Sequence, residues 1–129
     1  MKKQLILAGL ICIAALAGCA TRTVPVANVT TPIAGQHTND QIKTAILAAG
    51  QQRKWIMTPI YSGVIEGRLI QRSHVANIRI NYSTTSYSIN YVSSQNLLAG
   101  EGKIHRNYNS WINNLDRDIQ LKLAEQQIK

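Results

Sequence analysis

The side chains best suited to catalysis or metal binding are scattered along this chain. Its three histidines, His37, His74 and His105, stand at least 31 residues apart, whereas the ligands within one zinc motif are typically about two to five residues apart. We therefore expect no metal site and interpret the histidines as solvent-exposed. The serines include no Gly-x-Ser-x-Gly nucleophile motif. The sequence predicts no catalytic residue and no cofactor.

Carboxylates are few, which weakens the case for acid–base hydrolysis. The six acids are Asp40, Glu66, Glu101, Asp116, Asp118 and Glu125. Glycoside cleavage needs two carboxylates at a set separation, and only Glu66 falls within a predicted strand. We expect Glu66 to pair with Arg68 or Arg79 instead. A protein without enzymatic activity is the leading hypothesis, and a hydrolase is the alternative.

Basic residues form the strongest functional lead. The candidate anion-binding set comprises Arg68, Arg72, Arg79, Lys103, His105 and Arg106. The first three belong to two adjacent predicted strands and their turn. The others crowd the start of a predicted helix, where positive charge opposes the helix dipole. Because positive charge at a helix start is locally unfavourable, its presence there favours a functional role. A solvated basic face without a ligand is the alternative interpretation.

The aromatic residues have two interpretations. The chain contains two tryptophans, five tyrosines and no phenylalanine. Trp55, Trp111 and several tyrosines could line a binding groove. Since no phenylalanine supplies bulk, we expect these rings to build the core.

The N-terminal segment has the pattern of an export signal. Lys2 and Lys3 precede an apolar run over residues 5–17, which is shorter than the roughly 20 residues of a membrane-spanning helix. A basic start, a short apolar run and small residues at its end are typical of a secretory signal. A buried N-terminal helix is the alternative interpretation.

The end of this run, Leu16-Ala17-Gly18-Cys19, resembles the lipobox of bacterial lipoproteins. The resemblance implies cleavage between Gly18 and Cys19 and acylation of the Cys19 sulfur, by palmitate among other chains. Cys12 fits poorly because Ile11 precedes it, where the pattern requires a small residue. The resemblance further implies a periplasm-facing, lipid-anchored protein of a Gram-negative cell. Ala20 in place of aspartate favours the outer membrane over the inner membrane.

Signal removal divides the chain into three predicted parts. Residues 1–18 are the signal peptide, and the mature chain has 111 residues with net charge lowered from +8 to +6 by loss of Lys2 and Lys3. Residues 19–37 are predicted to be the lipid anchor and a flexible tether, because they contain Pro25, Pro32 and Gly35. A coil of this length reaches about 25 Å. Alternating valines leave an edge strand open as an alternative.

Residues 38–129 are predicted to form one α+β domain. A capping box of Thr38 and Gln41 begins the first helix, and residues 105–126 carry an apolar stripe at helical spacing. Between the helices, residues 55–60, 64–71, 76–82 and 86–92 show the alternation of half-buried strands. We expect the order α-β-β-β-β-α, with two helices packed on one face of a four-stranded antiparallel meander. Asp118 and Lys122 are expected to pair on the exposed side of the last helix.

Four stretches, residues 55–59, 63–67, 86–91 and 104–109, resemble a group of small, uncharacterised Gram-negative lipoproteins. The resemblance spans most of residues 38–124 and implies no particular activity. The sequence thus predicts an outer-membrane lipoprotein acting as a non-enzymatic binding or structural module of the cell envelope. Its expected partners are the membrane, through acylated Cys19, and an envelope protein, lipopolysaccharide or peptidoglycan, but no nucleic acid. The alternative is a small periplasmic hydrolase, or an accessory to one, acting on a component such as peptidoglycan.

Overall fold

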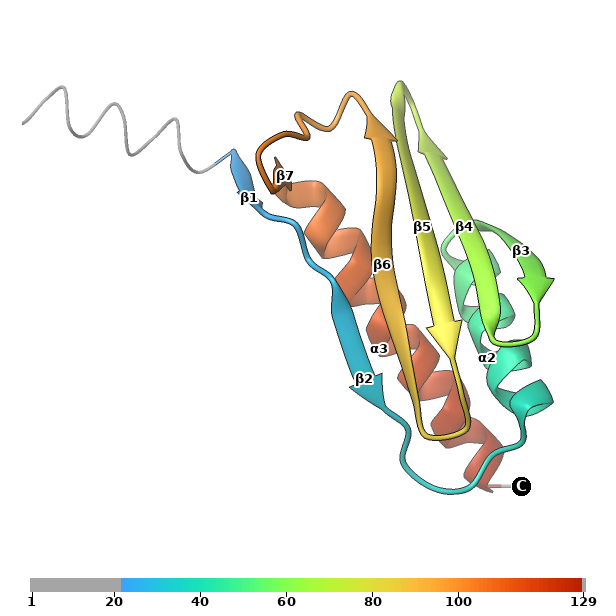
Figure 1. Cartoon of the computed structure of the whole chain (residues 1–129). Helices are drawn as coiled ribbons and strands as arrows, with labels where there is room; N and C mark the ends of the chain where they lie inside the picture. Colours follow the sequence, from blue (N-terminus) through green and yellow to red (C-terminus); the bar gives the residue numbers. More distant parts are fainter. Residues whose placement is uncertain (1–21, 129) are drawn as a thin grey trace, which may run out of the picture.

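The computed structural model describes residues 22–128, which form an α+β domain (Figure 1). The elements in chain order are β1 (Thr23–Pro25), β2 (Val29–Pro32), α2 (Asn39–Gln52), β3 (Ile56–Tyr61), β4 (Val64–Gln71), β5 (His74–Tyr82), β6 (Ser86–Gln95), β7 (Lys103–His105) and α3 (Arg106–Ile128). The predicted signal, lipobox and acylated cysteine lie outside the described residues.

The predicted meander is present but is one strand wider than expected. The main sheet is antiparallel, in the order β2-β6-β5-β4-β3, and β1 pairs with β7 in a separate two-stranded sheet. The α+β class and the antiparallel sheet are therefore confirmed, whereas the prediction of four strands is wrong. The helices both cover the same face of the main sheet (Figure 1).

Two of the extra strands, β1 and β2, come from the segment that was predicted to be a flexible tether. Val29 and Thr31 stand opposite Ile89 and Tyr87 of β6, and the Arg22 carbonyl accepts a hydrogen bond from the Arg106 N–H at 3.2 Å. Each proline of the segment ends a strand at a sheet edge, where a missing N–H is tolerated. The tether prediction is wrong for residues 22–32, and the alternative of an edge strand is confirmed for β2.

Helix α2 begins as predicted and ends in an unusual way. The Thr38 hydroxyl accepts from the Gln41 N–H, and the Gln41 side chain accepts from the Thr38 N–H, which completes the capping box. At the other end, the Trp55 N–H donates to the Gly50 carbonyl at 2.9 Å, in the pattern of a Schellman motif. Lys54 occupies the left-handed position with φ of 68°, where glycine is the usual residue.

The core lies between the sheet and the two helices. The predicted apolar faces are buried there: Ile42, Ala45, Ile46 and Ala49 from α2, Ile65, Leu69, Ile78, Ile80, Tyr87 and Ile89 from the sheet, and Tyr108, Ile112, Leu115, Ile119 and Leu123 from α3. The opposite sheet face is polar. On this face, Arg79 Nη2 lies 2.9 Å from Glu66 Oε2. Glu66 was expected to pair with Arg68 or Arg79, and the pairing with Arg79 is confirmed.

Asp116 ties the sheet to α3 from within this layer. Its Oδ1 accepts from the Thr31 hydroxyl at 2.7 Å and from the Tyr87 hydroxyl at 2.5 Å. Burial, and then the bond to Asp116, raise the pKa of the Tyr87 hydroxyl, which therefore remains a donor. One carboxylate thus joins β2, β6 and α3.

Two sequence predictions about polar residues are wrong. Asp118 is buried and pairs with Arg53 of the distant α2 end, not with Lys122, which lies 3.9 Å from Glu125. His37 is buried rather than solvent-exposed, and its Nε2 lies 3.1 Å from the Leu123 carbonyl oxygen. Both contacts join segments far apart in the chain, which local spacing does not reveal.

Candidate functional site

The fold places the predicted anion-binding set in two groups. Arg68 and Arg79 lie on the open sheet face, and Arg79 is neutralised by Glu66. Lys103, His105 and Arg106 lie along β7 and the first residue of α3. Arg72 lies in the β4–β5 turn. Arg68, Arg72 and Arg79 thus belong to β4, β5 and their turn, and anion binding by either group stays a prediction.

His105 has a structural role within this set. Its Nδ1 accepts a hydrogen bond from the Asn107 N–H at 3.1 Å, as an N-cap side chain does. His105 thus supplies a cap to α3.

Arg72 also borders a hollow with a volume of about 500 Å³. We call it the Trp–Arg hollow, and its lining residues are Arg53, Lys54, Trp55, Leu69, Ile70, Gln71, Arg72, Trp111 and Asn114. They come from the end of α2, the end of β4 with its turn, and α3. The volume is within the range of sites for small molecules.

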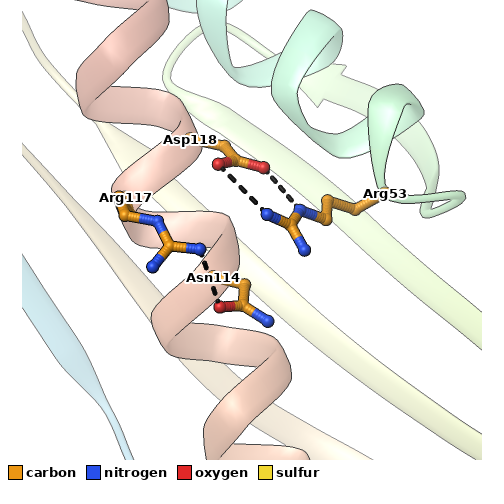
Figure 2. Close-up of polar contacts among 4 residues, drawn as sticks. All are labelled: Arg53, Asn114, Arg117 and Asp118. Atoms are coloured by element: carbon orange, nitrogen blue, oxygen red, sulfur yellow. Dashed lines mark hydrogen bonds and ion pairs between the residues drawn. The ribbon is translucent and has the colours of Figure 1, made fainter.

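Arg53 is positioned in the wall of the Trp–Arg hollow by an ion pair. Its Nε lies 2.6 Å from Asp118 Oδ2, and its Nη2 lies 3.4 Å from Oδ1 (Figure 2). The hydrogen bond to Asp118 raises the pKa of Arg53 above its already high ordinary value, against the opposing effect of desolvation. Figure 2 shows the third guanidinium nitrogen pointing away from the carboxylate. The Asp118 carboxylate therefore orients the Arg53 guanidinium and leaves its third nitrogen free to donate to another acceptor.

The side chain of Asn114, a lining residue of the Trp–Arg hollow, is oriented by Arg117. Arg117 Nη2 donates to Asn114 Oδ1 at 3.1 Å (Figure 2). Because arginine is only a donor, Asn114 must present its oxygen to it, and its amide nitrogen then points elsewhere. The residues of the hollow thus supply donors from Arg53, Lys54, Arg72 and Asn114.

Two of these basic residues hold strained backbone conformations. Lys54 has φ of 68° and Arg72 has φ of 58°. Side chains other than glycine adopt the left-handed region at a cost of about 1–2 kcal/mol. Strained residues concentrate at functional sites. Asn96, Leu98 and Glu101, which lie outside the hollow, adopt the same backbone conformation.

The tryptophans give the Trp–Arg hollow its apolar wall. Trp55 is buried, as the core interpretation predicted, while Trp111 is half-buried with part of its ring exposed. Both line the hollow, and they are the two tryptophans of the chain. A half-exposed indole packs against flat apolar surfaces, including the C–H faces of sugar rings. The combination suits a ligand with an anionic group attached to a ring.

The groups needed for metal binding do not converge in the described part of the chain. Residues 22–128 contain no cluster of three or more side chains that would hold a metal ion. Among the same residues, the hollow beside Glu66 is lined by Arg68, Asn77 and neighbours but by no histidine. Within residues 22–128, no helix has both the length and the hydrophobicity needed to cross a bilayer.

No known family matches this chain, and no curated protein is detectably similar to it. The candidate site therefore stands on its geometry. The sequence pattern singled out Arg72 but neither Arg53 nor Lys54. The sequence signal for Lys54 is a lysine at the left-handed position after a helix, where glycine is usual.

Proposed function

We propose that this protein is a lipid-anchored, non-enzymatic binding protein of the bacterial envelope that holds an anionic saccharide in the Trp–Arg hollow. The observation that carries the proposal is the donor-rich lining beside a half-exposed indole. Phosphates and carboxylates accept hydrogen bonds from such donors, and charged partners make the bonds stronger. Lipopolysaccharide carries phosphorylated sugars and peptidoglycan carries carboxylated ones, so both envelope polymers offer this chemistry.

The division of labour within the site follows from its contacts. Because Asp118 partly neutralises Arg53, Arg53 contributes an oriented hydrogen-bond donor more than net positive charge. Lys54 and Arg72 supply the uncompensated positive charge, and Trp111 supplies the flat apolar contact. The anchor implied by Cys19 keeps the site at the membrane that borders both polymers.

Tryptophan fluorescence offers a direct test, because both tryptophans of the chain line the Trp–Arg hollow. We expect the emission of the purified mature protein to change on titration with de-acylated, phosphorylated lipopolysaccharide core or with soluble muropeptides. Arg72→Gln should weaken the affinity about tenfold, since it removes one charge-assisted contact. Comparing the two titrants distinguishes the phosphate source from the carboxylate source.

Lys54→Gly is the informative partner variant. It removes a positive charge from the site, but glycine suits the left-handed backbone at this position. We expect weaker binding together with an unchanged or higher melting temperature, so the loss of affinity cannot be ascribed to unfolding. Lys43→Gln, in the first half of α2, is the matched control and should bind normally. Unchanged emission with both titrants, or normal affinity in Arg72→Gln and Lys54→Gly, would contradict the proposal.

A further inference from the structure

The folded domain begins very close to the proposed anchor. Strand β1 starts at Thr23 and is paired with β7, and the Arg22 carbonyl is already bonded to the start of α3. Only four peptide units separate Cys19 from Thr23, and four extended residues span at most about 14 Å. An acylated Cys19 would therefore hold the start of β1 near the bilayer surface. The flexible tether predicted from the sequence would have allowed a much larger distance.

Figure 1 shows which part of the domain this fixes. The start of β1, β7, the start of α3 and the β6–β7 loop lie together at one end, and the β5–β6 turn lies at the other. We call the first of these the anchor-side end. Strand β5 has nine residues, so the two ends are separated by about 30 Å.

The charge is distributed unequally between these ends. Among the described residues, the anchor-side end carries the basic side chains of Arg22, Lys103 and Arg106, with Glu101 as its acid. At the other end, Lys43 and Lys122 are balanced by Asp40 and Glu125. A surplus of positive charge attracts a protein to anionic lipid headgroups over roughly a Debye length.

One apolar side chain completes this surface. Leu98, in the β6–β7 loop, is 57% exposed. Leu98 also holds a left-handed backbone with φ of 55°, which presents a bulky side chain at a cost in strain. Basic residues flanking exposed apolar ones are the combination that binds an anionic bilayer surface.

We infer that the anchor-side end lies directly on the anionic phospholipid headgroups of the bilayer that holds the acyl chains, with Leu98 dipping among them. The inference rests on the proposed acylation of Cys19. Anionic lipid headgroups are the expected partner of this surface because the connection to the anchor is short and because the surface carries surplus positive charge. The opposite end then projects away from the membrane.

Paired fluorescent labels test this orientation. The acylated protein is reconstituted in phosphatidylcholine vesicles containing phosphatidylglycerol and a lipid with a spin-labelled headgroup. Leu98→Cys and Thr84→Cys place one label at the anchor-side end and one in the β5–β6 turn. We expect strong quenching at position 98 and little at position 84. Similar quenching at the two positions, or more at position 84, would overturn the inference.

Charge variants test the role of the basic residues. Lys103→Gln combined with Arg106→Gln should reduce quenching at position 98, whereas Lys43→Gln combined with Lys122→Gln should not. The intact mass of each purified protein reports acylation independently. An acylated protein with an unquenched label at position 98 refutes this inference alone, and an unacylated mature chain refutes the anchor and this inference together.

Discussion

Cys19→Ser is expected to abolish both acylation and signal cleavage. The precursor of 129 residues should accumulate without incorporating labelled palmitate, while the normal protein yields an acylated chain of 111 residues. The reason is that a thiol can reach its nucleophilic thiolate form near neutral pH, whereas a serine hydroxyl does not. Palmitate labelling and the intact mass of the envelope-associated protein measure the outcome.

Cys12→Ser is the matched control, because Cys12 is the other cysteine of the chain and lies within the apolar run of the signal. It should be cleaved and acylated normally. Normal processing of the Cys19→Ser protein would refute the lipid anchor. The proposed orientation against the bilayer would then lose its basis, although ligand binding in the Trp–Arg hollow would still be testable.

Asp116→Ala is expected to cause the largest loss of stability among the polar substitutions. It removes the carboxylate that accepts from both Thr31 and the buried Tyr87. Hydrogen bonds to charged groups contribute about 1.5–3 kcal/mol each, and the Tyr87 hydroxyl would keep only the Asp116 carbonyl at 3.1 Å. We expect the free energy of unfolding to fall by about 2–3 kcal/mol, measured by urea denaturation.

The companion variants separate charge from geometry. Asp116→Asn keeps an acceptor of similar shape and should lose about 1 kcal/mol, the value of the charge assistance. Tyr87→Phe should make a further Asp116→Ala change less costly, because the donor is then absent. A loss below about 0.5 kcal/mol for Asp116→Ala, which is the usual range for surface changes, would show that the tie between sheet and α3 is not stabilising.

Local patterns predicted the elements that depend on local spacing. The capping box at Thr38, the alternation within β4 and β5 and the apolar stripe of α3 are all confirmed. Strand β2 was missed as the leading interpretation because its four residues include Pro32 and two threonines. Its place is determined by pairing with β6, more than fifty residues later, and such a partner leaves no periodic signal of its own.

The candidate site was harder to predict for the same physical reason. Arg53, Arg72 and Trp111 belong to three elements and meet only through tertiary packing. Asp118 was expected to pair four residues away, yet its partner is Arg53, 65 residues away. Spacing along one helix predicts which side chains share a face, but not which distant residue the fold brings to that face.

Photo-crosslinking in intact cells tests the central claim, that the Trp–Arg hollow binds an anionic saccharide of the envelope. Gln71 is an exposed lining residue of the hollow, and Thr84 lies exposed at the opposite end of the domain. A photo-crosslinking amino acid at either position is activated in living cells, and the adducts are identified by mass spectrometry. We expect a saccharide adduct carrying phosphate or carboxylate from position 71 and none from position 84. Saccharide adducts from position 84 alone, or none from position 71, would contradict it.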